Sequence, residues 1–158
     1  MTVDGLKGAI CEWFNGEGSL GVQFVKSPVN AAAPVGNYVA VAVSGVEQYG
    51  SMMEPPPGDS AVRRWEQVAT VRFTEVEGDG DVLRQVRNAL QRPDFVSYCR
   101  GLDFTVWGLS GIMEDPTWDG EFVVRQHIFT ARFNFEDAET FESPKVESVD
   151  PLTLNGEE

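Results

Sequence analysis

Apolar and polar residues alternate most regularly near the end of the segment 101–135. Phe129, Ala131, Phe133 and Phe135 occupy every second position, and the residues between them are polar. A period of two predicts a β-strand with one apolar face. The connection before it, residues 115–120, reads Asp-Pro-Thr-Trp-Asp-Gly, which is typical turn chemistry. We therefore expect two strands within 101–135, joined by this connection.

Two earlier segments alternate in the same way. Residues 38–46 place three valines on one face, and residues 65–76 place Ala69, Val71 and Phe73 on one face and Arg72 on the other. These segments predict an antiparallel pair of strands. Between them, Gln48 to Arg64 contains three consecutive prolines, which cannot join a sheet interior. We expect this segment to be a long, mobile β-arm loop.

Helical spacing of apolar residues occurs in two segments. The first follows Thr2 and ends near Asn15, and the second runs from Asp81 to Leu90. Residues 20–25 suggest a brief strand, and residues 95–100 a further turn of helix. The main elements follow the order α-β-β-α-β-β, which suits an α+β domain with an antiparallel sheet covered on one face by helices.

Composition suggests one domain with an acidic tail. The chain has 158 residues, 42% of them hydrophobic, and this length supports a single core over residues 1–136. Residues 137–158 carry seven carboxylates and one lysine, and they lose the alternation, so we interpret them as a flexible acidic C-terminal tail. The formal net charge of −13 argues against binding to nucleic-acid phosphates or to an anionic membrane.

The low cysteine content points to a reducing compartment. Cys11 and Cys99 are too few for a disulfide scaffold and lack metal-site spacing, so we expect two half-buried hydrophobic residues. No apolar run is long enough for a transmembrane helix, and the N-terminus shows no secretory signal. We therefore expect a cytoplasmic protein that makes no contact with a membrane.

Candidate catalytic chemistry is sparse. His127 is the only histidine and lies inside the last expected strand, which favours a structural role over a metal or acid–base role. The carboxylates around Asp115 could pair with it in a small hydrolase. Gly78 and Gly80 precede a helix, but the pattern lacks the third glycine and the lysine of a phosphate loop, so we expect a turn. We predict no catalytic residue, no cofactor and no metal site.

Large aromatic residues leave two possibilities open. Trp65, Trp107, Trp118 and Phe122 suit a core or a protein interface equally well.

The order of elements from Ala33 to Phe135 resembles one known family. The pattern comprises Pro34-x-Gly36-x-Tyr38 before a strand, the strand 70–73, the helix 81–90, Arg100-Gly101-Leu102 before a strand, and finally Glu121-x-x-x-Arg125 before the Phe129–Phe135 strand. This series resembles the phage neck or tail terminator (tail-completion) proteins. Arg125 retains the family's arginine before the final strand, although its neighbours differ.

The resemblance implies a virion assembly protein and not an enzyme. Such a protein forms a ring, usually a homohexamer, that stops tail-tube growth and joins the tail to head-completion (connector) proteins. It is assembled in the host cytoplasm and resides in the virion neck. DNA would pass through the acidic lumen without specific binding. A tail-tube or adaptor component of the same assembly is the alternative, and the His127 hydrolase is a further one.

Six residues are our candidates for subunit or partner contacts. Met52 and Met53 lie in the proline-containing arm, which is expected to reach a neighbouring subunit or the tube. Arg72 and Arg125 belong to the segments that carry the resemblance, and Trp107 and Trp118 are the aromatic candidates.

Overall fold

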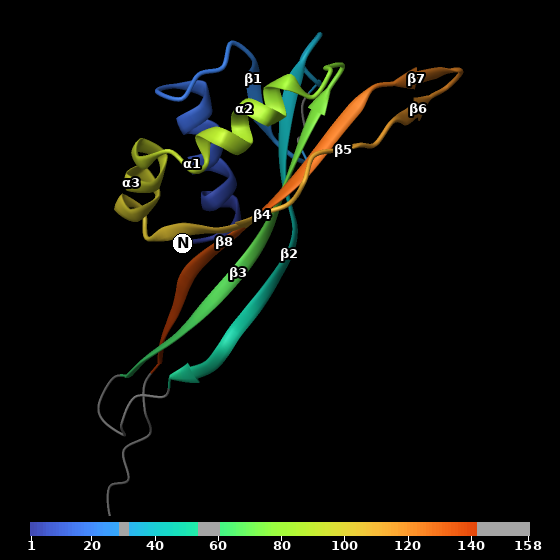
Figure 1. The fold of residues 1–158 in the computed structure, drawn as a ribbon. Helices are drawn as coiled ribbons and strands as arrows, with labels where there is room; N and C mark the ends of the chain where they lie inside the picture. The colour runs from blue at the N-terminus through green and yellow to red at the C-terminus, as the bar shows by residue number, and fades with distance from the viewer. Residues whose placement is uncertain (29–31, 54–60, 142–158) are drawn as a thin grey trace, which may run out of the picture.

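The structure is a computed structural model, and it describes residues 1–28, 32–53 and 61–141. Three helices accompany a mostly antiparallel sheet, which confirms the predicted α+β class (Figure 1). In chain order the elements are α1 (Val3–Asn15), β1 (Gln23–Lys26), β2 (Tyr38–Met53), β3 (Ala61–Val76), α2 (Asp81–Ala89), α3 (Pro93–Gly101), β4 (Phe104–Leu109), β5 (Met113–Glu114), β6 (Thr117–Asp119), β7 (Phe122–Val124) and β8 (Gln126–Phe141).

The main sheet has the strand order β1-β2-β3-β8-β4, with the short β5 also paired to β8. β1 runs parallel to β2, and the other neighbours are antiparallel. β3 and β8 pair from Ala61↔Phe141 to Val76↔Gln126, so they form the long centre of the sheet. β6 and β7 form a separate two-stranded sheet.

The helices gather on one face of the sheet, and the core lies between the two layers (Figure 1). The predicted alternation on the last strand is confirmed, because its four apolar residues from Phe129 to Phe135 are buried. Phe129 stacks on Phe73 of β3 with ring centroids 4.9 Å apart. From α1, Phe14 stacks on Phe24 of β1 at 4.6 Å. The period of two on the strands therefore fixes which face receives the helices.

The N-terminal helix follows its sequence signals. Thr2 Oγ1 accepts a hydrogen bond from the Gly5 N–H at 3.0 Å and caps α1, which ends at Asn15. Leu6, Ile10 and Phe14 recur every fourth residue and are fully buried. The cap and the apolar stripe together account for the extent and orientation of this helix.

The element order is richer than the predicted α-β-β-α-β-β. β1 overlaps the brief strand expected at 20–25, and α3 includes the further helical turn expected at 95–100, so both expectations are confirmed. The short strands β5 to β7 are additional. The connection at 115–120 was expected to be a plain turn, but it contains β6, which pairs with β7 in a hairpin. Short strands such as these carry too few residues to show a clear period in the sequence.

The arm prediction was wrong at its ends. β2 continues to Met53 and β3 begins at Ala61, so most of the described part of Gln48 to Arg64 is strand. The three prolines and the rest of 54–60 lie outside the described residues. Backbone pairing with β3 keeps Gln48, Tyr49 and Met53 in the sheet, although the sequence shows no regular apolar alternation there.

The predicted domain boundary at Asp137 falls inside β8, which continues to Phe141. Asp137 pairs with Trp65 of β3, so the acidic composition of this stretch did not prevent strand formation. The remainder of the predicted tail, 142–158, lies outside the described residues.

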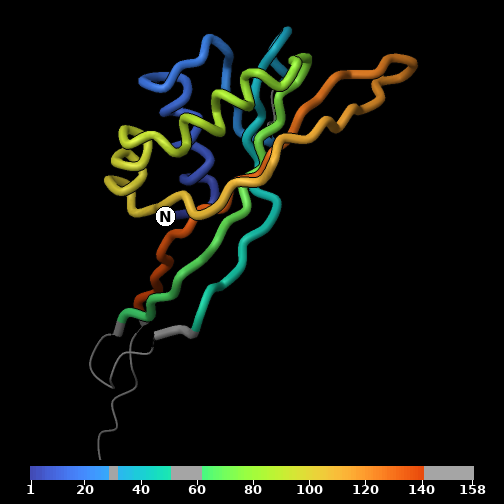
Figure 2. Tube along the Cα trace, in the orientation of Figure 1, coloured from blue at the N-terminus to red at the C-terminus, as the bar shows by residue number. Residues whose placement is uncertain are grey.

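Two extensions project from the layered body. The Cα trace in Figure 2 shows the far ends of β2, β3 and β8 continuing past the helices in one direction. The β6–β7 hairpin extends in the opposite direction. Both extensions place side chains away from the core between the helices and the sheet.

Candidate interaction surfaces

The sheet face opposite the helices carries an aromatic cluster built from three strands. The Arg132 guanidinium of β8 lies 4.7 Å from the centre of the Trp107 ring of β4, a cation–π distance. Tyr49 of β2 lies on the same face, with its ring centre 5.9 Å from that of Trp107. Glu47 Oε2 is 3.8 Å from the guanidinium Nη2 of Arg132. We call Glu47, Tyr49, Trp107 and Arg132 the open-face cluster.

A local irregularity in β4 explains how Trp107 joins this cluster. The register with β8 shifts between Val106 and Gly108, so Trp107 is an extra residue in the ladder. Such a bulge turns a side chain away from its regular alternation. Trp107 is 51% exposed, and Tyr49 is 57% exposed. The open-face cluster is therefore organised by internal contacts and still accessible.

Arg72 lies on this open face but in another part of the sheet. Its cross-strand neighbours are Ala42 on β2 and Thr130 on β8. The Arg72 Nε donates a 3.4 Å hydrogen bond to Thr74 Oγ1, and the residue is exposed. The small side chain of Ala42 leaves the guanidinium accessible.

Trp118 lies on the β6–β7 hairpin and not on the main sheet. Trp118, Phe122 and Val123 are 75%, 78% and 51% exposed. Trp118 pairs across the hairpin with Val123, whereas Phe122 pairs with Asp119, so apolar side chains occur at both pairs. Sequence reasoning brought Trp107 and Trp118 forward together, but they belong to separate surfaces.

Two further candidates mark the ends of the extensions. Arg125 follows the hairpin, its carbonyl accepts a 2.9 Å hydrogen bond from the Glu77 N–H, and the residue is exposed. Met53 pairs with Arg64 at the far end of β2, and Met52 precedes it. The backbone thus holds Arg125 at the base of the hairpin and the two methionines at the opposite end of the sheet.

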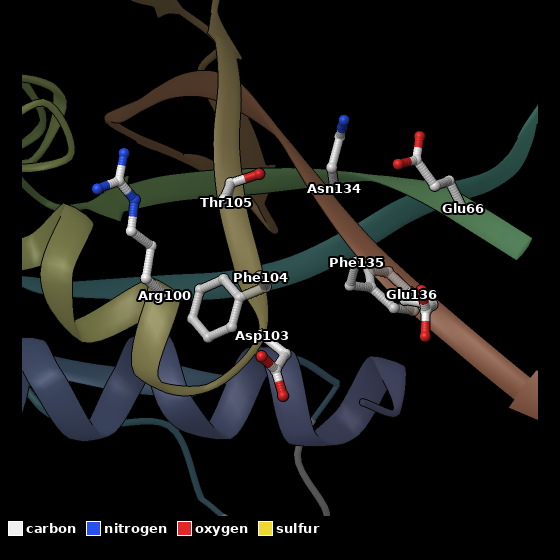
Figure 3. Close-up of a pocket in the computed structure, with 8 residues that line it drawn as sticks. All are labelled: Glu66, Arg100, Asp103, Phe104, Thr105, Asn134, Phe135 and Glu136. Atoms are coloured by element: carbon white, nitrogen blue, oxygen red, sulfur yellow. The ribbon is translucent and has the colours of Figure 1, made fainter. Parts of the chain in front are cut away.

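A polar cavity of about 330 Å³ lies beside the start of β4 (Figure 3). Arg100 of α3 and three carboxyl-bearing residues, Glu66, Asp103 and Glu136, are among its lining residues. Three acidic groups against one arginine make the cavity unsuited to an anionic ligand. Within the described ranges, no cluster of three or more His, Cys, Asp or Glu side chains could hold a metal ion.

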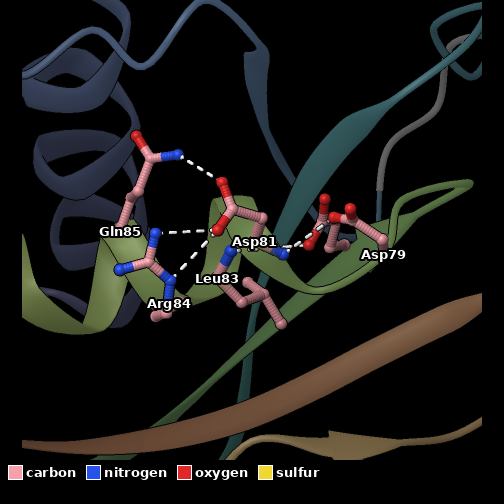
Figure 4. A network of polar contacts seen from close by, with 6 residues as sticks. Asp79, Asp81, Leu83, Arg84 and Gln85 are labelled. Atoms are coloured by element: carbon pink, nitrogen blue, oxygen red, sulfur yellow. Dashed lines mark hydrogen bonds and ion pairs between the residues drawn. The ribbon is translucent and has the colours of Figure 1, made fainter.

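The start of α2 carries a polar network in place of a phosphate loop (Figure 4). Asp81 Oδ1 accepts hydrogen bonds from Arg84 Nε and Nη2 at 3.0 and 2.8 Å. Asp81 Oδ2 accepts one from Gln85 Nε2 at 2.9 Å. These hydrogen bonds, first that of Arg84, lower the pKa of Asp81. Asp79 Oδ1 accepts from the Asp81 N–H at 2.9 Å, which is the expected turn chemistry.

Glu75 supplies the helix cap that sequence reasoning missed. The side chain is 0% exposed, and its Oε2 accepts a 3.4 Å hydrogen bond from the Leu83 N–H in the first turn of α2. Oε1 accepts from Asn37 Nδ2 at 3.3 Å. A Cβ at Gly78 would lie 1.9 Å from Oε1, so glycine leaves space for the glutamate. The N-cap residue Gly80 has no side chain for this purpose, and Glu75 takes its place.

His127 lies next to this region. Its backbone pairs with Glu75 on one side and Glu114 on the other. Its ring packs toward Gly80, where an added Cβ would be 3.0 Å from His127 Cδ2. The buried Nδ1 atom has no hydrogen-bond partner in this structure, and the described contacts of the Glu75 side chain go to Asn37 and Leu83. Among the described residues, the His127 ring therefore packs near Gly80, and its Nδ1 atom is not hydrogen-bonded to an acid or a base.

Both cysteines are buried, at 6% exposure for Cys11 and 1% for Cys99. Burial raises the pKa of the Cys11 thiol to about 11 and that of Cys99 to about 12. None of the described helices has the length and apolar character needed to cross a membrane.

Comparison with known proteins agrees with the resemblance seen in the sequence. A family model described as "Phage neck terminator protein" matches residues 4–158. The match extends beyond Ala33–Phe135 in both directions and includes α1 and the acidic C-terminal residues. No curated protein matches this chain.

Proposed function

Because the chain belongs to the phage neck terminator protein family, we propose that its subunits form a closed homohexameric ring at the end of the tail tube. The family places the protein among the structural components of the virion at the junction of tail and head. In our proposal the ring ends tube growth and binds the tail-tube protein on one side and a head-completion protein on the other. The family match over residues 4–158 carries this proposal.

Open sheet edges support assembly through subunit contacts. β1 pairs with β2 only as far as Val41, so for the rest of β2 the described strands provide one neighbour, β3. β4 forms the other edge of the sheet. Unpaired backbone groups on edge strands are ready to pair with a strand from another chain. We propose that the β2 edge, with Met52 and Met53, and the exposed Arg72 contact a neighbouring subunit or the tube.

The charge of the subunit is consistent with a DNA passage. A net charge of −13 gives the surface a strong negative field, which repels duplex phosphates. DNA could then pass through the lumen of a ring without adhering to it. The acidic composition that argues against a DNA-binding protein thus supports a DNA-conducting one.

The decisive experiment combines the purified protein with its tail-tube protein. Native mass spectrometry and negative-stain imaging should show closed rings, and tubes polymerised in its presence should be short and capped at one end. Long filaments formed by this protein alone would instead identify a tube component. A protein that stays monomeric and leaves tube length unchanged would overturn the proposal.

A further inference from the structure

The β6–β7 hairpin exposes apolar side chains that its own subunit does not cover. Trp118 and Phe122 are 75% and 78% exposed although they lie on neighbouring pairs of a very short hairpin. The hairpin projects beyond the main sheet, away from α2 and α3 (Figure 1). An isolated two-stranded hairpin is marginally stable in water. Exposed aromatic side chains on a projecting element are typical of a protein-binding site.

A groove of suitable size lies along the β4 edge of the same subunit. Its cavity of about 400 Å³ is lined by the consecutive residues Val106–Leu109 of β4 and by Arg87, Leu90, Gln91 and Val96 from α2, α3 and their connection. Consecutive strand residues point to alternate faces, so a cavity that touches all four runs along the strand edge. The groove therefore offers the half-buried Val96 of α3 beside an edge strand.

The two surfaces carry opposite charges. Residues 114–125, which include the hairpin, have four acidic residues and one arginine, a net charge of −3. Residues 81–101, which include α2 and α3, have four arginines and two aspartates. Arg84 and Arg92 form ion pairs with Asp81 and Asp94, so Arg87 is the charged side chain that lines the groove. Two such acidic subunits repel each other, so a stable contact between them requires local pairing of opposite charge.

We propose that the β6–β7 hairpin of one copy binds the groove between β4 and helices α2 and α3 of the next copy. Trp118 is the main apolar anchor, and the acidic residues of the hairpin face Arg87. This inference rests on the proposed ring, for which it supplies one subunit contact. The two surfaces differ, so the contact is head-to-tail, and such contacts close into rings when the rotation between copies permits.

Photo-crosslinking locates the contact directly. p-Benzoylphenylalanine at position 123 lies opposite Trp118 on the hairpin and leaves the tryptophan in place. Rings are assembled from equal amounts of ¹⁴N- and ¹⁵N-labelled subunits, irradiated and digested. Crosslinks should join position 123 of one isotopic form to peptides within 87–109 of the other. Crosslinks confined to one copy, to another region or to the tube protein would overturn the proposal.

A pair of variants tests the head-to-tail geometry. Trp118→Ser should weaken subunit association about 30-fold or more, the effect of losing an interface hot spot. Val35→Ser is the matched control, because Val35 is 102% exposed outside both surfaces, and it should assemble normally. Val96→Asp should damage the groove instead, with circular dichroism to confirm that it folds.

Mixing the two damaged forms gives the sharpest outcome. The Trp118→Ser variant keeps an intact groove, and the Val96→Asp variant keeps an intact hairpin. The hairpin of the second can therefore bind the groove of the first, so the mixture should form heterodimers but no rings. Rings of normal affinity from Trp118→Ser would overturn this contact while leaving the proposed function intact. Wild-type protein that forms no ring, even with the tube protein, would overturn both.

Discussion

The buried glutamate at the start of α2 makes a prediction that links the core to the groove. Glu75 accepts hydrogen bonds from the Leu83 N–H and from Asn37, and it is 0% exposed. α2 also supplies Arg87 to the groove. If Glu75 caps this helix, its removal should destabilise the subunit and displace one wall of the groove.

The expected size follows from these contacts. Glu75→Ala removes two hydrogen bonds whose net contribution is about 0.5–1.5 kcal/mol each. It also leaves the buried Leu83 N–H without its acceptor, at a cost of about 1–3 kcal/mol that overlaps with the first loss. We expect the free energy of unfolding to fall by about 2–4 kcal/mol. Glu75→Gln retains the shape and one acceptor oxygen, so its loss should be about 1 kcal/mol.

Urea denaturation followed by circular dichroism measures both variants, at a protein concentration where the wild type is monomeric. Glu66→Gln is the control, because Glu66 lies on the same strand β3 and is exposed, so its effect should stay within about 0.5 kcal/mol. Equal stability of Glu75→Ala and wild type would refute the capping role. Increased stability would show that burying the carboxyl group costs more than the cap contributes.

Three further predictions concern the core, the thiols and the open face. Phe133→Ala should lower the free energy of unfolding by about 3–5 kcal/mol in the same urea assay, because Phe133 is 0% exposed; a loss below about 1 kcal/mol would contradict its core position. Burial raises the pKa of Cys11 to about 11 and that of Cys99 to about 12 from an ordinary 9.0, so above pH 9 the native chain holds protons that the unfolded chain releases. Thermal stability should therefore fall as pH rises from about 9 to about 12, and a thiol reagent at pH 8 should label the two cysteines only after unfolding. In the same urea assay, a double-mutant cycle of Trp107→Ala and Arg132→Ala should give a coupling of about 0.5–1 kcal/mol in the free energy of unfolding. If the two single losses of stability simply add, the 4.7 Å contact contributes nothing to stability.

Much of the fold was predictable because strong local periods coincide with burial. The Phe129–Phe135 alternation and the α1 stripe each carry several apolar residues at one spacing, and the structure buries both sets. The strand boundaries were less predictable. Residues 48–53 of β2 and 137–141 of β8 show no regular apolar alternation. Their strand conformation depends on pairing with β3, a tertiary contact that the local sequence does not show.

The sequence indicated which residue types the candidate surfaces contain, but not where in the fold those residues lie. Trp107 and Trp118 suited core or interface equally until the bulge in β4 and the hairpin showed both to be exposed. Arg132 is one of the polar residues between the alternating apolar positions of β8, and the sequence did not indicate its contact with Trp107 because that contact joins β8 to β4. Glu75 gave no local signal, since its capping contact with Leu83 depends on how α2 returns to the sheet.

The alternation that builds the core also separates stability from assembly. On β8, Phe133 faces the helices while its neighbours Arg132 and Asn134 face the opposite side, so a change at one set need not disturb the other. Trp118 is separated further still, on a hairpin outside the main sheet. Because Trp118 is 75% exposed, its ring adds little to the stability of the isolated subunit. Burial of such a ring in a complex stabilises the complex by roughly 25 cal/mol per Å² of apolar surface covered. In the proposed contact another copy covers this tryptophan, and the hairpin, more than any residue of the core, should then control whether subunits associate.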